Sequence, residues 1–204
     1  MTAISDRIMR RARAQTAHGS RTVFTPKDFL DFGDRAAVDQ ALSRLTKAGS
    51  LRRVARGMYD IPRVNPILKG EAAPDLGAVV DAVARRDKVT IVPNGMVAAN
   101  RLGLTNAVSA RNDYLTDGPS RTLCVGRSVI RLKHAGPKLM ALKDRPAGDV
   151  VRAVHWLGRD LATDAVADTL RRRLSDDAKK DLARARGKLD SLAAKVADRV
   201  LADE

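Results

Sequence analysis

The segment from Asp34 to Gly49 constrains the fold of this chain more than any other. Its apolar residues recur at helical spacing, at Val38, Ala41, Leu42 and Leu45. A stripe at i, i+3, i+4 and i+7 predicts an amphipathic helix with one buried face. Gly49 follows the stripe, and Gly adopts the left-handed conformation that often ends a helix. We therefore expect a helix over residues 34–48.

The opposite face of this helix is polar. A rotation of about 100° per residue places on it Ala36, Gln40, Ser43 and Lys47, with Asp39 and Arg44 on its flanks and Arg35 near its start. A polar face leaves side chains free to contact a partner.

A basic hairpin follows the helix at once. The stretch "RRVARG" contains Arg52, Arg53 and Arg56 and turns at Arg56-Gly57. Its alternation is imperfect because Leu51 and Val54 are out of phase, so we expect a β-bulge or a strand that begins at Arg52. Alternation also places Arg52 and Arg53 on opposite faces of the strand, so one of the two should face inward.

Two helices are predicted before this segment. Residues 4–14 have apolar side chains near helical spacing. Residues 25–33 predict a helix of about two turns, with Thr25 as N-cap, Pro26 in the first position and Asp28 completing a capping box. The order helix, short helix, longer helix and basic hairpin predicts a winged helix-turn-helix. In that fold the longer helix lies in the major groove and the hairpin lies along phosphates.

The net charge supports a polyanionic partner. The chain of 204 residues has a formal net charge of +14. Residues 1–62 and 63–150 each contribute +6, and residues 151–204 contribute +2. Neutralising phosphates with such cations releases condensed counterions and favours nucleic acid.

Other whole-chain features narrow the class of protein. No apolar stretch approaches the length of a membrane span, and the N-terminus has no signal-peptide pattern. The one cysteine, Cys124, lies in an apolar run and is expected to be a small core residue. We therefore expect a cytoplasmic protein without a membrane partner.

The composition changes over residues 62–74, which are rich in Pro, Gly and Ala. We place a domain boundary there, with a winged helix-turn-helix domain over residues 1–66 and a second domain over residues 67–204. The second domain should contain a helix from Asp75, a strand in "KVTIVPNG", a helix in "GMVAANRLGL" and strands within residues 109–134, with helices from 146 onward. The predicted fold class is α+β, with a small, mostly antiparallel sheet, surrounding helices and a helical C-terminus.

Three stretches carry a resemblance to a known family. They are "VFTPKDFLDFGDRAAVDQALSRLTKAGSLRRVARGMYDIP", "PNGMVAANRLGL" and "YLTDGPSR", in that order. The chain resembles the AbiEi-type antitoxins of bacterial type IV toxin–antitoxin systems, in their shorter subfamily, over most of residues 1–160. The resemblance implies an N-terminal winged helix that binds inverted repeats in its own promoter and represses the operon. It also implies a C-terminal domain that counters a co-encoded nucleotidyltransferase toxin.

The residues expected to contact DNA follow from the helix, the hairpin and this resemblance. The candidates are Arg35, Gln40, Ser43, Arg44, Lys47, Arg52, Arg53 and Arg56. Gln40 can pair bidentately with adenine, and Arg35 can reach guanine or a phosphate. No individual residue is assigned to the antitoxin half.

Two other functions fit parts of the sequence. The chain can be a stand-alone winged-helix transcription factor whose C-terminal domain senses a ligand. It can also be a nucleic-acid-processing enzyme in which Asp113 and Asp117, on one strand face, share Mg²⁺. A turn that requires Asp-Gly-Pro explains Asp117 better, and the histidines lack the spacing of metal ligands. We therefore expect no enzyme, no cofactor and no metal.

Overall fold

The computed structural model describes residues 3–65, 69–143 and 145–202. The chain divides into two compact units, Met1–Val89 with Leu123–Ile130 and Thr90–Thr122 with Arg131–Glu204. The chain combines helices with small sheets, which confirms the α+β class. In the part of the chain described, no helix is both long and apolar enough to cross a membrane.

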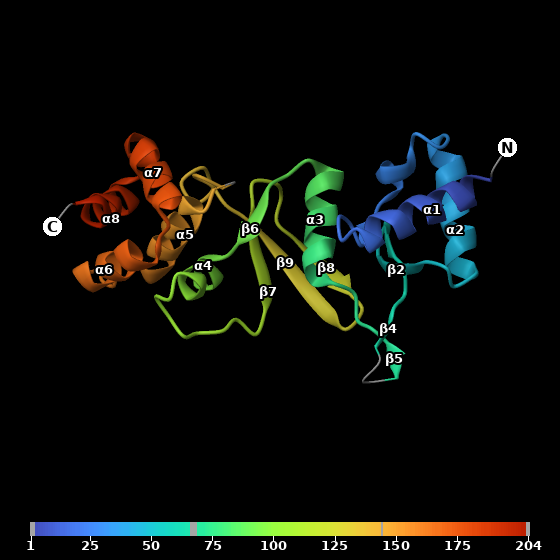
Figure 1. Ribbon diagram of the computed structural model, residues 1–204, viewed down its shortest axis with the longest axis horizontal. Helices are drawn as coiled ribbons and strands as arrows, with labels where there is room; N and C mark the ends of the chain where they lie inside the picture. The colour runs from blue at the N-terminus through green and yellow to red at the C-terminus, as the bar shows by residue number, and fades with distance from the viewer. Residues whose placement is uncertain (1–2, 66–68, 144, 203–204) are drawn as a thin grey trace. The chain divides into compact units, whose positions relative to one another are not determined.

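The first unit combines helices with a three-stranded sheet. Its elements are α1 (Ile4–Ala17), β1 (Val23–Phe24), η1 (Pro26–Phe29), α2 (Arg35–Lys47), β2 (Arg52–Ala55), β3 (Met58–Asp60), the short pair β4 (Val64–Asn65) and β5 (Gly70–Glu71), and α3 (Leu76–Asp87). The sheet order is β1-β3-β2, and both pairings are antiparallel. Helix α1 lies against α2, with η1 beside α2 (Figure 1).

Helix α2 forms where the sequence predicts it. The Asp34 carboxylate accepts a hydrogen bond from the Ala37 N–H at 2.7 Å, and Gly49 has a φ of +70° just beyond the C-terminus. The apolar face packs into one core with side chains of α1, β1 and η1, which are Ile8, Phe24 and Phe29. The four predicted core residues are all buried, at Val38, Ala41, Leu42 and Leu45.

The hairpin β2–β3 confirms the predicted irregularity. Strand β2 begins at Arg52, and its register with β3 shifts between Arg53 and Ala55. Leu51 lies just before the strand, so both Leu51 and Val54 can be buried although their spacing is out of phase for one regular strand.

The predicted helix over residues 25–33 is shorter than expected. It is a single 3₁₀ segment, η1, closed at its start by Thr25 and Asp28. The Asp28 carboxylate accepts hydrogen bonds from the Thr25 N–H at 2.7 Å and from its hydroxyl at 3.0 Å. One turn suffices here because Phe29 is already buried in the core.

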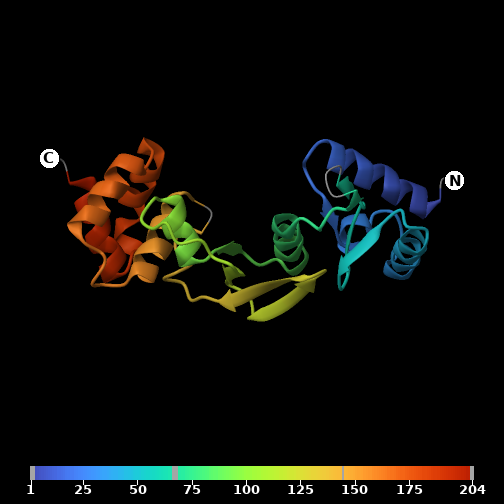
Figure 2. The ribbon, with the colours of Figure 1, turned by 90° about the horizontal axis from the view of Figure 1, so that it is seen from below.

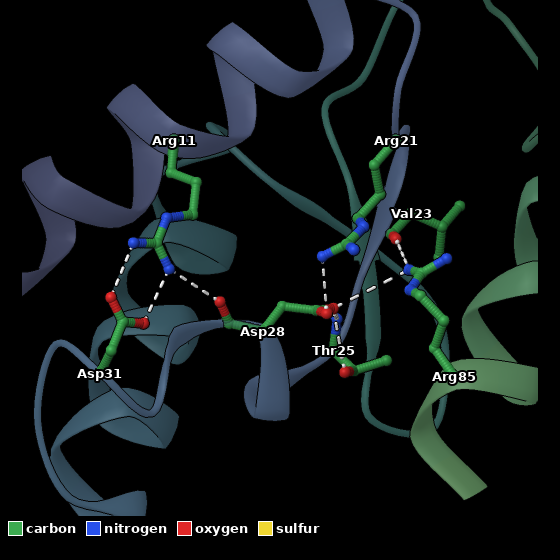
Figure 3. Close-up of polar contacts among 7 residues, drawn as sticks. All are labelled: Arg11, Arg21, Val23, Thr25, Asp28, Asp31 and Arg85. Atoms are coloured by element: carbon green, nitrogen blue, oxygen red, sulfur yellow. Dashed lines mark hydrogen bonds and ion pairs between the residues drawn. The ribbon is translucent and has the colours of Figure 1, made fainter. Parts of the chain in front are cut away.

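Arginines from three segments converge on η1, as Figure 3 shows. Arg21 pairs with Asp28 at 2.8 Å, and the Arg85 guanidinium lies 3.9 Å from the same carboxylate. Arg11 forms a two-pronged pair with Asp31, at 2.7 Å on each side. This hydrogen-bonded pair lowers the pKa of Asp31. The Asp28 carboxylate thus contacts both Arg21, in the loop before η1, and Arg85, on α3, and joins these two segments.

The predicted boundary between residues 66 and 67 lies outside the described residues. The two compact units divide after Val89, and α3 belongs to the first of them. The Arg85 guanidinium donates to the Val23 carbonyl at 2.9 Å, which ties α3 to β1.

The second unit begins with β6 (Ile91–Pro93), α4 (Gly95–Arg101) and β7 (Asn112–Thr116). Strands β8 (Arg121–Val125) and β9 (Ser128–His134) form the next hairpin, and the sheet order is β6-β7-β9-β8. The turn end of this hairpin belongs to the first unit. The helices that follow are α5 (Ala147–Leu157), α6 (Asp164–Arg173), α7 (Asp176–Ala185), η2 (Arg186–Lys188) and α8 (Ser191–Leu201).

Small side chains bring α4 and α5 into close contact. A Cβ atom added at Gly95 would lie 2.4 Å from the Trp156 Cβ and 2.6 Å from the Arg152 carbonyl oxygen. The shared core is rich in alanine and valine, including Ala98, Ala99 and Val150. The helices α5 to α8 form one bundle beside α4 (Figure 2).

Replacement of Asp28 tests the network around η1. We expect Asp28→Ala to lower the free energy of unfolding by about 1–3 kcal/mol, because two donors of Thr25 and the Arg21 guanidinium lose their acceptor. Asp31→Ala is the matched control, because it removes an exposed carboxylate nearby. Urea unfolding followed by circular dichroism measures both, and equal losses would contradict this role of Asp28.

Candidate nucleic-acid interface

The outward face of α2 presents the polar residues predicted from its sequence. Each of the five candidates on this helix is exposed, and they are Arg35, Gln40, Ser43, Arg44 and Lys47. Arg35 pairs with Asp39 at 2.7 Å, with both side chains about half exposed. A surface pair of this kind is weak and can be exchanged for a phosphate contact.

The hairpin arginines separate into two kinds. Arg53 and Arg56 are exposed, on β2 and at the turn before Gly57. Gly57 has a φ of +66°, so the tight turn that presents Arg56 requires a residue tolerant of the left-handed region.

Arg52 is held inside the unit. Its Nε and Nη2 donate to the two oxygens of Asp60 at 3.0 and 2.5 Å, and Asp60 is only 4% exposed. Its Nη1 donates to the Ala72 carbonyl at 2.7 Å and to Glu71 at 3.1 Å. The hydrogen bond with Asp60 raises the pKa of Arg52. The sequence predicts Arg52 as a DNA contact. In the structure its hydrogen bonds give it a structural role, and the carboxylates of Asp60 and Glu71 compensate its charge.

Two cations that were not among the candidates lie beside two of the predicted ones. A cavity of about 390 Å³ in the first unit is lined by Lys27 and Arg86 together with the predicted Arg35 and Arg56. Lys27 donates to the Arg86 carbonyl at 2.6 Å, and Arg86 donates to the Arg56 carbonyl at 3.2 Å. The Arg86 Nε lies 2.8 Å from an oxygen of the Asp87 carboxylate, with which it forms an ion pair. We call these four residues the basic pocket.

The basic pocket joins two regions that are distant in the sequence. Arg35 stands at the start of α2, and Arg56 stands at the turn of the hairpin. Phosphates carry the same charge at every step of a duplex, so such a cluster supplies affinity and orientation with little sequence information. Reading of bases would fall to Gln40 and its neighbours on the exposed face of α2.

Comparison with known protein families matches residues 8–182 to a family of unknown function, DUF6088. The chain belongs to DUF6088. Among curated proteins, none matches the sequence. The crystal structure of the RV2827C protein from Mycobacterium tuberculosis is similar, at 15% sequence identity and a TM-score of 0.40. The similarity covers 98% of this chain and 81% of that chain.

The two aspartates considered for Mg²⁺ have other partners in this DUF6088 protein. Asp117 accepts the Thr90 N–H and the Lys143 ammonium, each at 2.8 Å. The Lys143 hydrogen bond, followed by that of Thr90, lowers the pKa of Asp117. Asp113 lies 3.6 Å from Arg131. Residues 3–65, 69–143 and 145–202 contain no group of three or more His, Cys, Asp or Glu that could hold a metal ion.

Cys124 differs from the expectation. It is exposed on β8 rather than buried in the core. Its neighbours explain the difference, because burial along β8 is partial and only Val125 is fully buried. An apolar run in the sequence therefore does not make every residue of this strand a core residue.

Salt titration separates the exposed hairpin arginines from the structural one. We expect Arg53→Ala and Arg56→Ala to weaken binding to promoter and random duplexes alike. Each should reduce the slope of log affinity against log salt concentration by about 1, because each removes one phosphate contact. Arg52→Ala should leave the slope unchanged and lower the melting temperature, because its bonds to Asp60 are lost. Three unchanged slopes would show that the hairpin does not contact DNA.

Proposed function

We propose that this protein is a DNA-binding antitoxin and transcriptional autorepressor of a type IV toxin–antitoxin operon. In this proposal it acts in the cytoplasm, binds inverted repeats in its own promoter, and counters a nucleotidyltransferase toxin encoded beside it. The DNA-binding half and the antitoxin half rest on different observations and are tested separately.

One observation carries the DNA-binding half. The exposed polar face of α2 and the exposed arginines of the β2–β3 hairpin occur in the same unit, and Arg35 and Arg56 line one pocket. This arrangement suits a winged helix-turn-helix, in which α2 enters the major groove and the hairpin follows the backbone. The excess of cations over residues 1–150 supports the same partner.

The antitoxin half rests on the resemblance of three sequence stretches to AbiEi-type antitoxins. Two of these stretches fall in the second unit, over β6–α4 and over β7 with the turn after it. The role is therefore proposed for the second unit as a whole, and no side chain is assigned to it.

Gln40 is the proposed base reader. We expect Gln40→Ala to relax the sequence preference at one base position, with a loss of about 1–3 kcal/mol of discrimination. Lys47→Ala is the matched control on the same exposed face. It should weaken binding to all sequences without changing the preference, because a lysine ammonium contacts phosphates as a point charge. Binding-site selection from a random library measures both, and an unchanged preference in Gln40→Ala would exclude Gln40 as a reader.

Two assays in bacteria test the two halves of the function. We expect the wild type to repress a reporter under its own promoter and to restore growth when the neighbouring nucleotidyltransferase is expressed. The double variant Arg53→Ala/Arg56→Ala should lose repression and keep growth rescue, because its changes are confined to the hairpin. Failure of the wild type to repress would overturn the autorepressor role. Failure to rescue, or the absence of such a gene beside its own, would overturn the antitoxin role.

A further inference from the structure

A large pocket lies within the second unit. Its volume is about 760 Å³, within the range of small-molecule sites. It is bordered by the start of α4, the loop before β7, strands β7 and β9, and α5. The side chains that the argument uses are Asp113, Tyr114, Arg131, Lys133, Arg152 and Trp156.

Arg152 is the unusual member of this lining. It is 3% exposed, and its Nη2 donates to Asp149 at 2.7 Å. Its Nε and Nη1 are buried without a hydrogen-bond partner in the part of the chain described. Asp149 also lies 3.8 Å from Arg101, so one carboxylate serves two guanidinium groups. A buried donor left without an acceptor is costly, and an anion that reached the guanidinium would supply the missing acceptor.

The charge of the pocket favours an anion. Arg111, Arg131, Lys133 and Arg152 line it, and Asp113 is the acidic residue of the lining. Asp113 lies 3.6 Å from Arg131, which leaves an excess of cations. His155 also lines the pocket, but its ring lies 2.8 Å from Asp190. Guanidinium groups bind phosphate oxygens in a two-pronged geometry, so phosphate suits this set well.

Aromatic and apolar side chains line the same pocket. Trp156 is 42% exposed, and Val108 beside the pocket is 84% exposed. Tyr114 also contributes to the lining. Aromatic rings provide faces on which a nucleobase can stack, and such stacking tolerates any base.

We propose that this pocket binds a free nucleoside phosphate, with its phosphates on Arg131, Lys133 and Arg152 and its base against Trp156. The site does not depend on DNA binding, because none of its residues belongs to the first unit. It adds a small-molecule ligand to a unit for which no binding residue has been assigned.

The chain contains one tryptophan, so Trp156 fluorescence reports on this pocket directly. The full chain is titrated with each of the four ribonucleoside triphosphates, and calorimetry measures the same affinities independently. Two partial ligands are titrated in the same way. Sodium triphosphate lacks the nucleoside, and the free nucleosides lack the phosphates. We expect saturable binding of the nucleotides with a change in Trp156 emission, and weaker binding of both partial ligands. The double variant Arg53→Ala/Arg56→Ala should bind nucleotides normally, whatever its effect on DNA binding.

Three variants locate the ligand. We expect Arg152→Gln and Arg131→Gln each to weaken nucleotide binding about tenfold, because each removes a charge-assisted hydrogen bond to phosphate. The Arg131 side chain is half exposed, so its replacement should preserve folding even if Arg152→Gln does not. Arg184→Gln is the matched control, because Arg184 is an exposed arginine of the same unit outside the pocket. It should bind nucleotides as the wild type does.

Several results would overturn the proposal. They are the absence of saturable binding by both methods, unchanged affinity in Arg131→Gln and Arg152→Gln, or an equal loss in Arg184→Gln. Equal affinity for sodium triphosphate and nucleotides would show that the base is not recognised. Equal affinity for nucleosides and nucleotides would show that the phosphates are not recognised.

Discussion

The pair between Arg52 and Asp60 determines which arginines of the hairpin remain available to a partner. The two residues are opposite each other in the β2–β3 register, and Asp60 is buried. A buried carboxylate needs a compensating cation, so Arg52 must turn inward. Alternation then sends Arg53 outward and Val54 back to the core. The outward direction of Arg53 is thus a consequence of one internal ion pair, whereas Arg56 is presented by the turn at Gly57.

Local patterns were sufficient to predict the elements of the interface. The apolar spacing, Asp34 and Gly49 define α2 within one stretch of chain, and the phase error at Leu51 and Val54 predicts the bulge. The contacts that each cation makes could not be predicted from local patterns. The partners of Arg52 include Glu71 and Ala72, and the basic pocket needs Arg86 from α3. These contacts join residues far apart in the sequence, and periodicity contains no information about them.

The helical C-terminal part shows why total charge alone was a poor guide to location. Several of its cations pair with aspartates of the bundle, as Arg186 does with Asp198 and Arg199 with Asp164. Arg171, from the basic run on α6, bonds to Asp168 and to the Arg199 carbonyl. These contacts agree with the near balance of charge over residues 151–204. The exposed cations of α2 and the hairpin, by contrast, lie in the first unit, on the surface proposed to bind DNA.

The two proposed sites would bind phosphate by different physical means. Arg53 and Arg56 are exposed, so their attraction to DNA is screened by salt and depends on counterion release. At the second site Arg131 and Lys133 are exposed too, but Arg152 is buried and its orientation is fixed by Asp149, so the contribution of Arg152 should be screened much less. DNA binding should therefore weaken steeply as salt rises, whereas nucleotide binding should change less over the same range. A protein with both sites could retain its small ligand under conditions that release it from DNA.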